Sequence, residues 1–149
     1  MDYTPKDKDF RKKVQDSFGR QKFMDLIGAE LVEVNPGYCE IKVPFDETLT
    51  QQHGFFHAGV ISTLADNTAG YAAFSLMEAN SSILTVEFKL NLLAPGKGDS
   101  LIGKAKVIKN GRTLTICRSE IYVIQDGNAT LCAAGQSTLI ELKNKIDNR

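Results

Sequence analysis

The sequence predicts an α+β domain in which an antiparallel sheet of about six strands wraps around one long central helix, with an extra helix before it. Three observations support this prediction: a proline-free run of small and apolar residues over 58–79, β-rich segments on both sides of it, and the hairpin signals Asn110-Gly111 and Asp126-Gly127. A chain of 149 residues, 42% of them hydrophobic, is sufficient for one such domain.

The chain is expected to start with an amphipathic surface helix within residues 7–27. Its apolar residues recur near helical spacing among charged side chains, at Phe10, Val14, Phe18 and Met24. This helix would bury one stripe and flank the main domain.

A hairpin is expected next. The β-rich runs 29–34 and 38–44 lie on either side of Asn35-Pro36-Gly37, a combination typical of a tight turn. Residues 45–56 are then expected to form a loop that leads into the central helix.

The central helix is expected over residues 58–79 and would be about 33 Å long. Small or apolar residues occupy almost every face of it, which predicts burial. A membrane span fits poorly, because polar residues that include Asp66 interrupt its middle and are costly in lipid.

Four strands should follow as an antiparallel meander, over residues 83–93, 100–108, 113–124 and 129–139. These elements divide the chain into a flanking helix in 1–27, the sheet-and-helix domain in 28–140, and a polar tail in 141–149.

Charge and cysteine content exclude several classes of function. With 18 basic and 18 acidic side chains the net charge is zero, so neither nucleic acid nor a membrane surface is an expected partner. Cys39, Cys117 and Cys132 lie in apolar runs without CxxC spacing, which favours reduced thiols. Residues 1–13 have no apolar signal-peptide core. We therefore expect a cytoplasmic protein.

Asp66 is the candidate catalytic residue. A carboxylate without a partner in an apolar helix is destabilising or takes up a proton, so its presence calls for a function. Lys42 is the one basic residue between Lys22 and Lys89, which leaves few local partners for it. The alternative is a structural role, as a cap or in an ion pair.

The start of the same helix is a candidate oxyanion site. His57-Ala58-Gly59 would present unpaired backbone N–H groups beside small side chains. Ala58 precedes Asp66 by eight residues, or about 12 Å along the helix axis. One carbonyl cannot contact both within a chain, so a shared reaction requires a dimer with two sites at its interface.

Other kinds of site have weaker support. His53 and His57 have the i, i+4 spacing of a helical metal pair, but they lie in an expected loop with no third ligand nearby. The sequence has no G-x-S-x-G elbow, although a Cys–His or Ser–His nucleophilic pair stays open. We expect no metal and no cofactor.

The motif in residues 51–66, QQHGFFHAGVISTLAD, resembles the signature of PaaI-like (phenylacetate-pathway-type) hotdog-fold acyl-CoA thioesterases, in which an Asp lies nine positions after a His. Residues 85–95 and 111–114 resemble the strand and hairpin that follow in this family. The resemblance covers about residues 28–140.

This resemblance implies hydrolysis of an acyl-CoA thioester by a homodimer or a dimer-of-dimers tetramer. Asp66 would be the general base or the nucleophile, and the Ala58 N–H would polarise the carbonyl. Gln51 stands where many members have Asn, Thr85 stands where a Ser or Thr orients water, and His57 would shape the helix start. Gly54, Phe56, Gly59, Asn67 and Arg112 would contact the substrate.

The remaining substrate contacts would come from charged and aromatic side chains. The candidates for the CoA phosphates are Lys97, Lys104, Lys106, Lys109 and Arg112. The candidates for an acyl pocket are Phe55, Phe56, Tyr71 and Phe74. Because a thioester is already activated, a carboxylate and an oxyanion donor could suffice without a metal.

Two rival functions use the same fold. A hydratase or dehydratase acting on acyl thioesters would pair a His with an acidic residue, and His57 could be that His. A non-catalytic acyl-CoA-binding module would keep the pocket without turnover. Asp66 argues against the second, since acyl binding gains nothing from a carboxylate in an apolar helix.

Overall fold

The computed structural model describes residues 3–146 and contains six strands and three α-helices. The strands are β1 (Glu30–Asn35), β2 (Tyr38–Pro44), β3 (Ser81–Leu92), β4 (Ser100–Asn110), β5 (Leu114–Gln125) and β6 (Asn128–Lys143). The helices are α1 (Phe10–Arg20), α2 (Lys22–Leu26) and α3 (Ala58–Phe74), with a short 3-10 helix at Glu47–Leu49.

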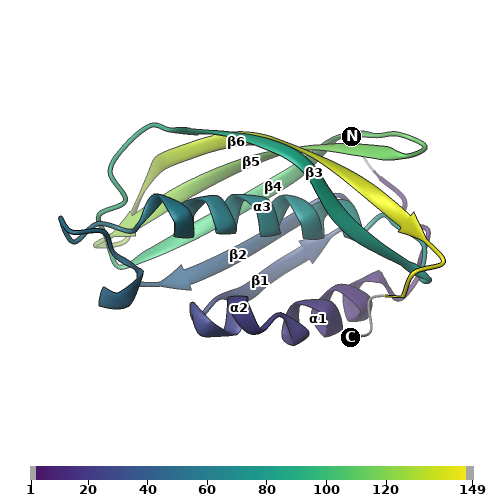
Figure 1. Ribbon diagram of the computed structural model, residues 1–149, viewed down its shortest axis with the longest axis horizontal. Coiled ribbons are helices and arrows are strands. Elements are labelled where there is room, and N and C mark those ends of the chain that lie inside the picture. The colour runs from purple at the N-terminus through teal and green to yellow at the C-terminus, as the bar shows by residue number, and fades with distance from the viewer. Residues whose placement is uncertain (1–2, 147–149) are drawn as a thin grey trace.

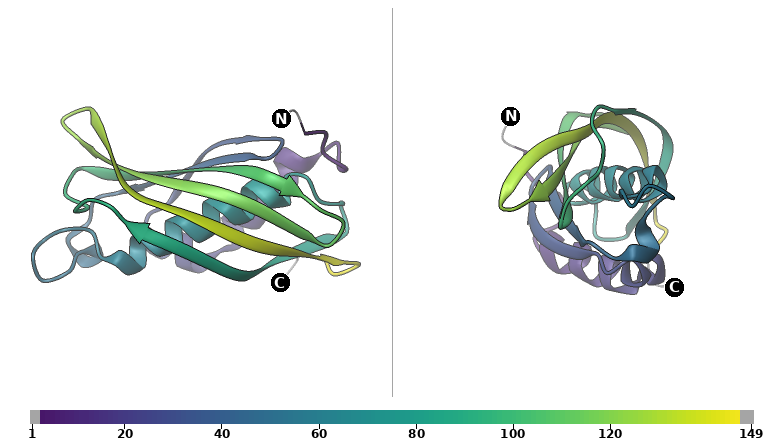
Figure 2. Two further views of the ribbon diagram at one scale, coloured as in Figure 1. Left: turned by 90° about the horizontal axis from the view of Figure 1, so that it is seen from above. Right: turned by 90° about the vertical axis from the view of Figure 1, so that its left-hand side faces the viewer.

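The strands form one antiparallel sheet in the order β1-β2-β4-β5-β6-β3, and this sheet wraps around α3 (Figures 1 and 2). The predicted architecture of a curved sheet around one long helix is confirmed. No helix in residues 3–146 combines the length and the apolar character needed to cross a membrane.

The predicted meander is correct for β4, β5 and β6 but wrong for β3. The β5–β6 turn has positive φ at Asp126 (49°) and Gly127 (79°), as its Asp-Gly signal predicts. Strand β3 pairs with β6, with Thr85 opposite Leu139, and so forms an edge of the sheet. The connection after Leu92 is too long for a tight turn, and β4 pairs with β2 instead.

Helix α3 is shorter than predicted and is buried on only one side. It ends at Phe74, where tighter turns place the N–H of Leu76 on the Ala73 carbonyl. The side facing the sheet includes Leu64, Thr68 and Ala72, all with no exposed surface. The other side, the uncovered face of α3, consists of Ala58, Gly59, Val60, Ser62, Thr63, Asp66, Asn67 and Gly70.

The expected N-terminal helix is two helices that lie beside β1 and α3 (Figure 1). Gln21 has an extended backbone (φ −76°, ψ 95°) and separates α1 from α2. The predicted apolar stripe is confirmed, because Phe10, Val14 and Met24 are buried in the common core. The N-terminal segment therefore packs on the domain along one wall of the uncovered face.

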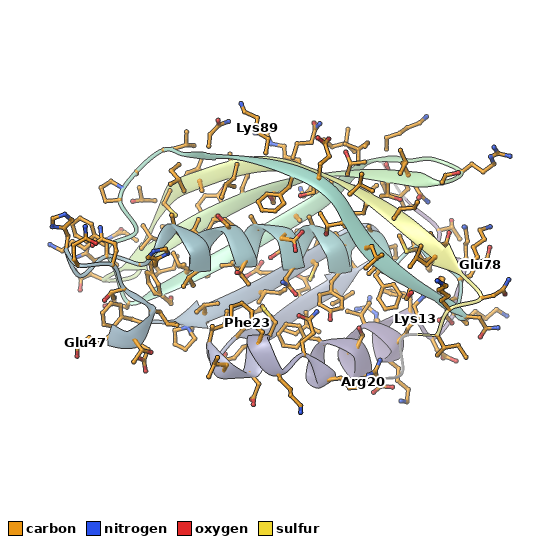
Figure 3. All side chains as sticks on the ribbon, in the orientation of Figure 1. Lys13, Arg20, Phe23, Glu47, Glu78 and Lys89 are labelled. Carbon is orange, nitrogen blue, oxygen red and sulfur yellow. The ribbon has the colours of Figure 1, made fainter. Side chains whose placement is uncertain are left out.

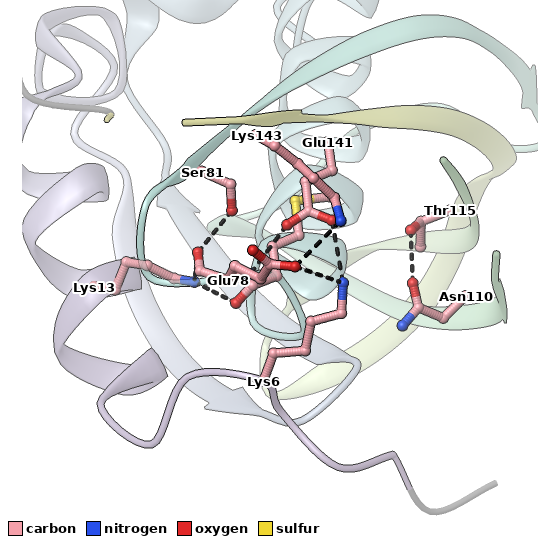
Figure 4. A network of polar contacts seen from close by, with 9 residues as sticks. Lys6, Lys13, Glu78, Ser81, Asn110, Thr115, Glu141 and Lys143 are labelled. Atoms are coloured by element: carbon pink, nitrogen blue, oxygen red, sulfur yellow. Dashed lines mark hydrogen bonds and ion pairs between the residues drawn. The ribbon is translucent and has the colours of Figure 1, made fainter. Parts of the chain in front are cut away.

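A network of charged side chains holds this segment against the turn between α3 and β3 (Figure 4). Lys13 donates to the Glu78 carbonyl at 3.0 Å, and the Glu78 N–H donates to Glu141 at 3.0 Å. Lys6 lies 3.3 Å from Glu141, and Lys143 lies 3.2 Å from Glu78. Residues 141–143 were expected in the polar tail but form the end of β6, and 147–149 lie outside the described residues.

Candidate active site

Asp66 lies on the uncovered face of α3, opposite β3. Its Oδ1 accepts a hydrogen bond of 2.7 Å from the Thr85 hydroxyl, and no hydrogen bond from the described residues reaches its Oδ2. The β3–β6 register shifts between Thr85 and Glu87, a bulge of the kind that re-aims side chains beside active sites. The arrangement leaves one carboxylate oxygen available for reaction.

Asp66 is partly buried rather than enclosed in the core, because it opens into a cleft of about 470 Å³. One wall of this Asp66 cleft is β3, with Ile83, Leu84 and Thr85, and the opposite wall comes from α1, with Ser17, Arg20 and Gln21. Asn67, Gly70 and Tyr71 complete it. The cleft is therefore built by residues from three separate parts of the chain.

The α1 wall was not predicted from the sequence. The Gln21 amide donates to the Tyr71 hydroxyl at 2.7 Å, and the Ser17 and Tyr71 hydroxyls lie 3.3 Å apart. A signal was present, because Ser17 and Gln21 continue the helical spacing of the apolar stripe at Val14 but are polar. Polar residues within an otherwise buried stripe indicate a polar contact with the domain.

The start of α3 provides a separate polar feature. The Gly59 N–H donates to Nδ1 of the His57 side chain at 2.8 Å, and the Val60 N–H donates to the His57 carbonyl at 2.9 Å. The Ala58 N–H has no acceptor among the described residues. His57 thus caps the helix as expected and leaves the Ala58 N–H available for a ligand.

Gly59 leaves room for this cap. A Cβ on Gly59 would lie 2.9 Å from Nδ1 of His57, so a larger residue would force the imidazole to shift. Because Nδ1 accepts this hydrogen bond, the proton of the neutral imidazole is on Nε2. The Nδ1 atom of His57 is therefore engaged at the start of the helix.

Ala58 and Asp66 occupy the same straight helix and are not brought together within one chain. Their eight-residue separation corresponds to about 12 Å along the axis. Gln51 is likewise engaged within its own loop, where its side-chain oxygen accepts from the His53 N–H and Gly54 has φ +77°. Within a single chain, the Asp66 cleft and the start of α3 are therefore two separate features.

Several residues that were predicted to contact the substrate are buried in the single chain. Phe56 is 3% exposed and packs edge-to-face on Phe45 at 5.6 Å, so it belongs to the core. Phe74 is also a core residue, at 1% exposure. Tyr71 is buried too, although it lines the Asp66 cleft.

The basic candidates for CoA phosphates do not gather at the Asp66 cleft. Arg112 lies in the exposed connection between β4 and β5, outside the cleft lining. Lys104 pairs with Glu40 at 3.4 Å, and Lys106 lies over the Tyr38 ring. These lysines alternate with buried residues of β4 and so lie on the sheet face opposite α3.

The cysteines are poor candidates for a nucleophile. All three are buried and unpaired. Burial raises the pKa of Cys117 to about 12 and that of Cys132 to about 11, and it raises the pKa of Cys39 as well. Protonated thiols are weak nucleophiles. Among residues 3–146, no group of three His, Cys, Asp or Glu side chains is arranged to hold a metal.

The two edges of the sheet differ. Strand β1 has six residues and contacts α1, whereas β3 has twelve and no strand on its outer side among the described residues. Leu84, Val86 and Leu92 on β3 are each more than half exposed, and Phe88 is 45% exposed. An open apolar edge strand is a surface that other proteins keep covered.

Comparison with known proteins identifies the family. The Thioesterase superfamily matches residues 53–130, more than half of the chain. A candidate esterase of Saccharolobus solfataricus is 30% identical over 127 residues, which cover 85% of this chain and 82% of that protein. The 1,4-dihydroxy-2-naphthoyl-CoA hydrolase of Listeria monocytogenes is 25% identical over 121 residues, with coverage of 81% and 97%.

Solved structures agree with the sequence matches. A thioesterase family protein from Silicibacter pomeroyi has a TM-score of 0.89 at 46% identity, covering 90% of this chain and 98% of that one. The E. coli PaaI protein, at 17% identity and a TM-score of 0.81 over 91% and 95% of the two chains, shares the fold. The chain therefore belongs to the Thioesterase superfamily and has the hotdog fold.

Proposed function

We propose that the protein hydrolyses acyl-CoA thioesters to a free acid and CoA, using Asp66 of one chain and the Ala58 N–H of a second. The observation that carries this proposal is the Asp66 carboxylate, which Thr85 holds by one oxygen while the other faces the cleft. The family match and the name of the Listeria relative, a CoA-thioester hydrolase, support this substrate class.

The proposed chemistry needs only groups that the chain supplies. Asp66 accepts a proton from a water molecule, whose oxygen attacks the thioester carbon. The carbonyl electron pair moves to oxygen, where the Ala58 N–H stabilises the charge. The intermediate then collapses, the C–S bond breaks, and the sulfur leaves with the proton that Asp66 had taken. In the alternative route Asp66 attacks the carbon directly, and the C–S bond breaks to release CoA as a thiolate. Water then hydrolyses the anhydride to the free acid and the Asp66 carboxylate, and the proton released goes to the thiolate.

The open edge of β3 supports a homodimer with two such sites. Helix α3 and strand β3 run in opposite directions, and Thr85 is level with Asp66. A displacement of about 12 Å toward the helix start corresponds to about four strand residues, which reaches Lys89. Antiparallel pairing with Thr85 opposite Lys89 of a second chain would therefore bring each Asp66 toward the other chain's Ala58.

His57 bears on the choice between hydrolysis and hydration. Its Nδ1 accepts the Gly59 N–H, so only Nε2 could exchange a proton with substrate, as a hydratase would require. The proposed hydrolysis by Asp66 needs no proton from His57 and leaves this imidazole to cap the helix. A cytoplasmic location is part of the same proposal, supported by three unpaired cysteines.

A panel of acyl-CoAs assayed by thiol release, run beside an enoyl-CoA hydration assay, tests this function. We expect CoA release from at least one acyl-CoA, no hydration, and no loss of turnover with EDTA. Hydration without thiol release would replace the proposal with a hydro-lyase. Binding without either reaction would indicate an acyl-CoA-binding module.

A further inference from the structure

A second depression lies at the other end of the uncovered face of α3. This α2 groove, of about 690 Å³, is bounded by Phe23, Leu26, Leu49, Val60 and Thr63, with His57 and Gly59 at its end. Leu26 is 78% exposed and Phe23 is 55% exposed, although both are large apolar residues. Figure 3 shows Phe23 on the side of α2 that faces α3. The groove is therefore an apolar surface without cover in the single chain.

The α2 groove and the Asp66 cleft lie along the same face of α3. Gly59 and Thr63 line the groove, while Asp66 and Gly70 line the cleft, and these four residues follow one another at helical spacing. The groove includes the residues on both sides of Ala58, so it adjoins the available N–H. In the proposed dimer, the groove of one chain and the cleft of the other would meet at the same carbonyl.

The two depressions differ in chemistry, as do the two arms of the substrate. The acyl arm of a simple acyl-CoA is apolar, while the pantetheine arm carries two amides that need hydrogen-bond partners. The cleft is lined by polar side chains, those of Ser17, Arg20, Gln21 and Asn67, of which the Gln21 amide also donates to Tyr71 and the Asn67 amide to the Thr63 carbonyl. The groove offers mainly alkyl and phenyl surface.

We propose that the α2 groove of one chain holds the acyl group of a thioester whose attacking carboxylate comes from the other chain. This inference rests on the proposed function. It makes Phe23 and Leu26 specificity-determining residues, and both lie outside the segment 53–130 that matches the family. The volume of the groove suits a medium-length alkyl chain or an aromatic acyl group.

Leu26→Asp tests the groove, because Leu26 is exposed enough for the change to leave the fold intact. A carboxylate there would be desolvated by an alkyl chain and not by an acetyl group. We expect the ratio of kcat/KM for octanoyl-CoA to that for acetyl-CoA to fall at least about 10-fold. Ile108→Asp, at another exposed apolar residue (44%), should leave the ratio unchanged. An unchanged ratio in Leu26→Asp would overturn the inference.

A heterodimer of Leu26→Asp and Asp66→Asn chains, purified by two tags, tests the contribution across the interface. The one remaining Asp66 belongs to the Leu26→Asp chain, so the proposal predicts that its acyl group binds in the intact groove of the other chain. The ratio of kcat/KM for octanoyl-CoA to that for acetyl-CoA should then equal the wild-type ratio. A ratio as low as that of the Leu26→Asp homodimer would place the groove on the same chain as the carboxylate and contradict the proposal.

Binding separates failure of this inference from failure of the proposed function. The non-hydrolysable thioethers S-octyl-CoA and S-ethyl-CoA can be titrated into each variant by calorimetry, whether or not the wild type turns over any thioester. We expect Leu26→Asp to weaken S-octyl-CoA binding selectively. Equal binding of S-octyl-CoA by both proteins, or a change only in oligomeric state, would show that the groove does not hold the acyl group.

Discussion

At the scale of single residues, the hydrogen bond between Thr85 and Asp66 determines which carboxylate oxygen is available. Thr85 occupies Oδ1 at 2.7 Å, so Oδ2 is the oxygen that can take a proton from water. The sequence indicated Asp66 as the candidate because a carboxylate is conspicuous in an apolar helix. Ser17 and Gln21 also carried a signal, as polar residues at the spacing of an apolar stripe, but their contact with Tyr71 could be assigned only from the position of the N-terminal segment.

Asp66→Asn should preserve the fold and lower kcat for the best acyl-CoA by at least about 100-fold, because an amide cannot accept the proton. The side chains are nearly equal in size, and the amide oxygen can still accept from Thr85. Circular dichroism and gel filtration control for folding and assembly. Wild-type turnover in the mutant would remove Asp66 from the mechanism.

Thr85→Ala should lower kcat about 10-fold with a smaller change in KM, because Asp66 loses the group that orients it. Thr85→Ser keeps the hydroxyl and is the matched control, with activity expected near that of the wild type. If both variants lose activity equally, the methyl group of Thr85 matters and the hydrogen bond does not.

At the scale of elements, hydrophobic spacing and turn residues identified α3 and the β5–β6 hairpin, because both signals are local. The partner of β3 was not predictable in this way, because β3 pairs with β6, beyond β4 and β5 in the chain, and such long-range pairing has no signal in neighbouring residues. The break at Gln21 was missed because no proline marks it, and the isolated Gly19 just before it is also tolerated inside a helix.

Glu141 of β6 contacts Lys6 in the N-terminal segment and Glu78 in the turn before β3, and it should make stability depend on pH. Burial alone would raise the pKa of Glu141, but hydrogen bonds from the Glu78 N–H and Ser81, with the Lys6 ammonium, outweigh it and lower the pKa. A lowered pKa in the folded state means that the ionised group stabilises the fold above its ordinary range. That stabilisation is lost as pH falls through the folded-state value.

Glu141→Gln should therefore lower stability at pH 7 by about 1–3 kcal/mol and flatten its decrease in acid. Thermal unfolding from pH 3 to 7 measures both effects. Asp16→Asn, which breaks the exposed Lys12–Asp16 pair, is the control and should change stability by less than about 0.5 kcal/mol. Parallel pH curves for wild type and Glu141→Gln would contradict this account.

At the scale of the whole molecule, the separation of about 12 Å between Ala58 and Asp66 and the open edge of β3 both support the proposed dimer. Each observation is independent, since one comes from helix length and the other from strand order. Pairing Thr85 with Lys89 of a second chain places the two-fold axis at Glu87, which would then lie opposite its own copy.

Glu87→Cys should consequently form a disulfide between two chains under mild oxidation, because directly opposite residues in an antiparallel pair have Cα atoms about 4.5–5.5 Å apart. Non-reducing gel electrophoresis detects it, and the native cysteines do not interfere since all are buried. Lys89→Cys is the offset control and should stay uncrosslinked. Crosslinking of Lys89→Cys alone would show a different register.

In the proposed dimer, where the site is divided between two chains, turnover depends on the concentration of the dimer. An isolated chain has a carboxylate and an N–H donor but no place where one carbonyl can meet both. Turnover per chain should therefore decline when the protein is diluted below the dissociation constant of the dimer. Far below that constant, turnover per chain should be proportional to the protein concentration. A low cellular concentration of the protein would thus keep this activity low without any inhibitor.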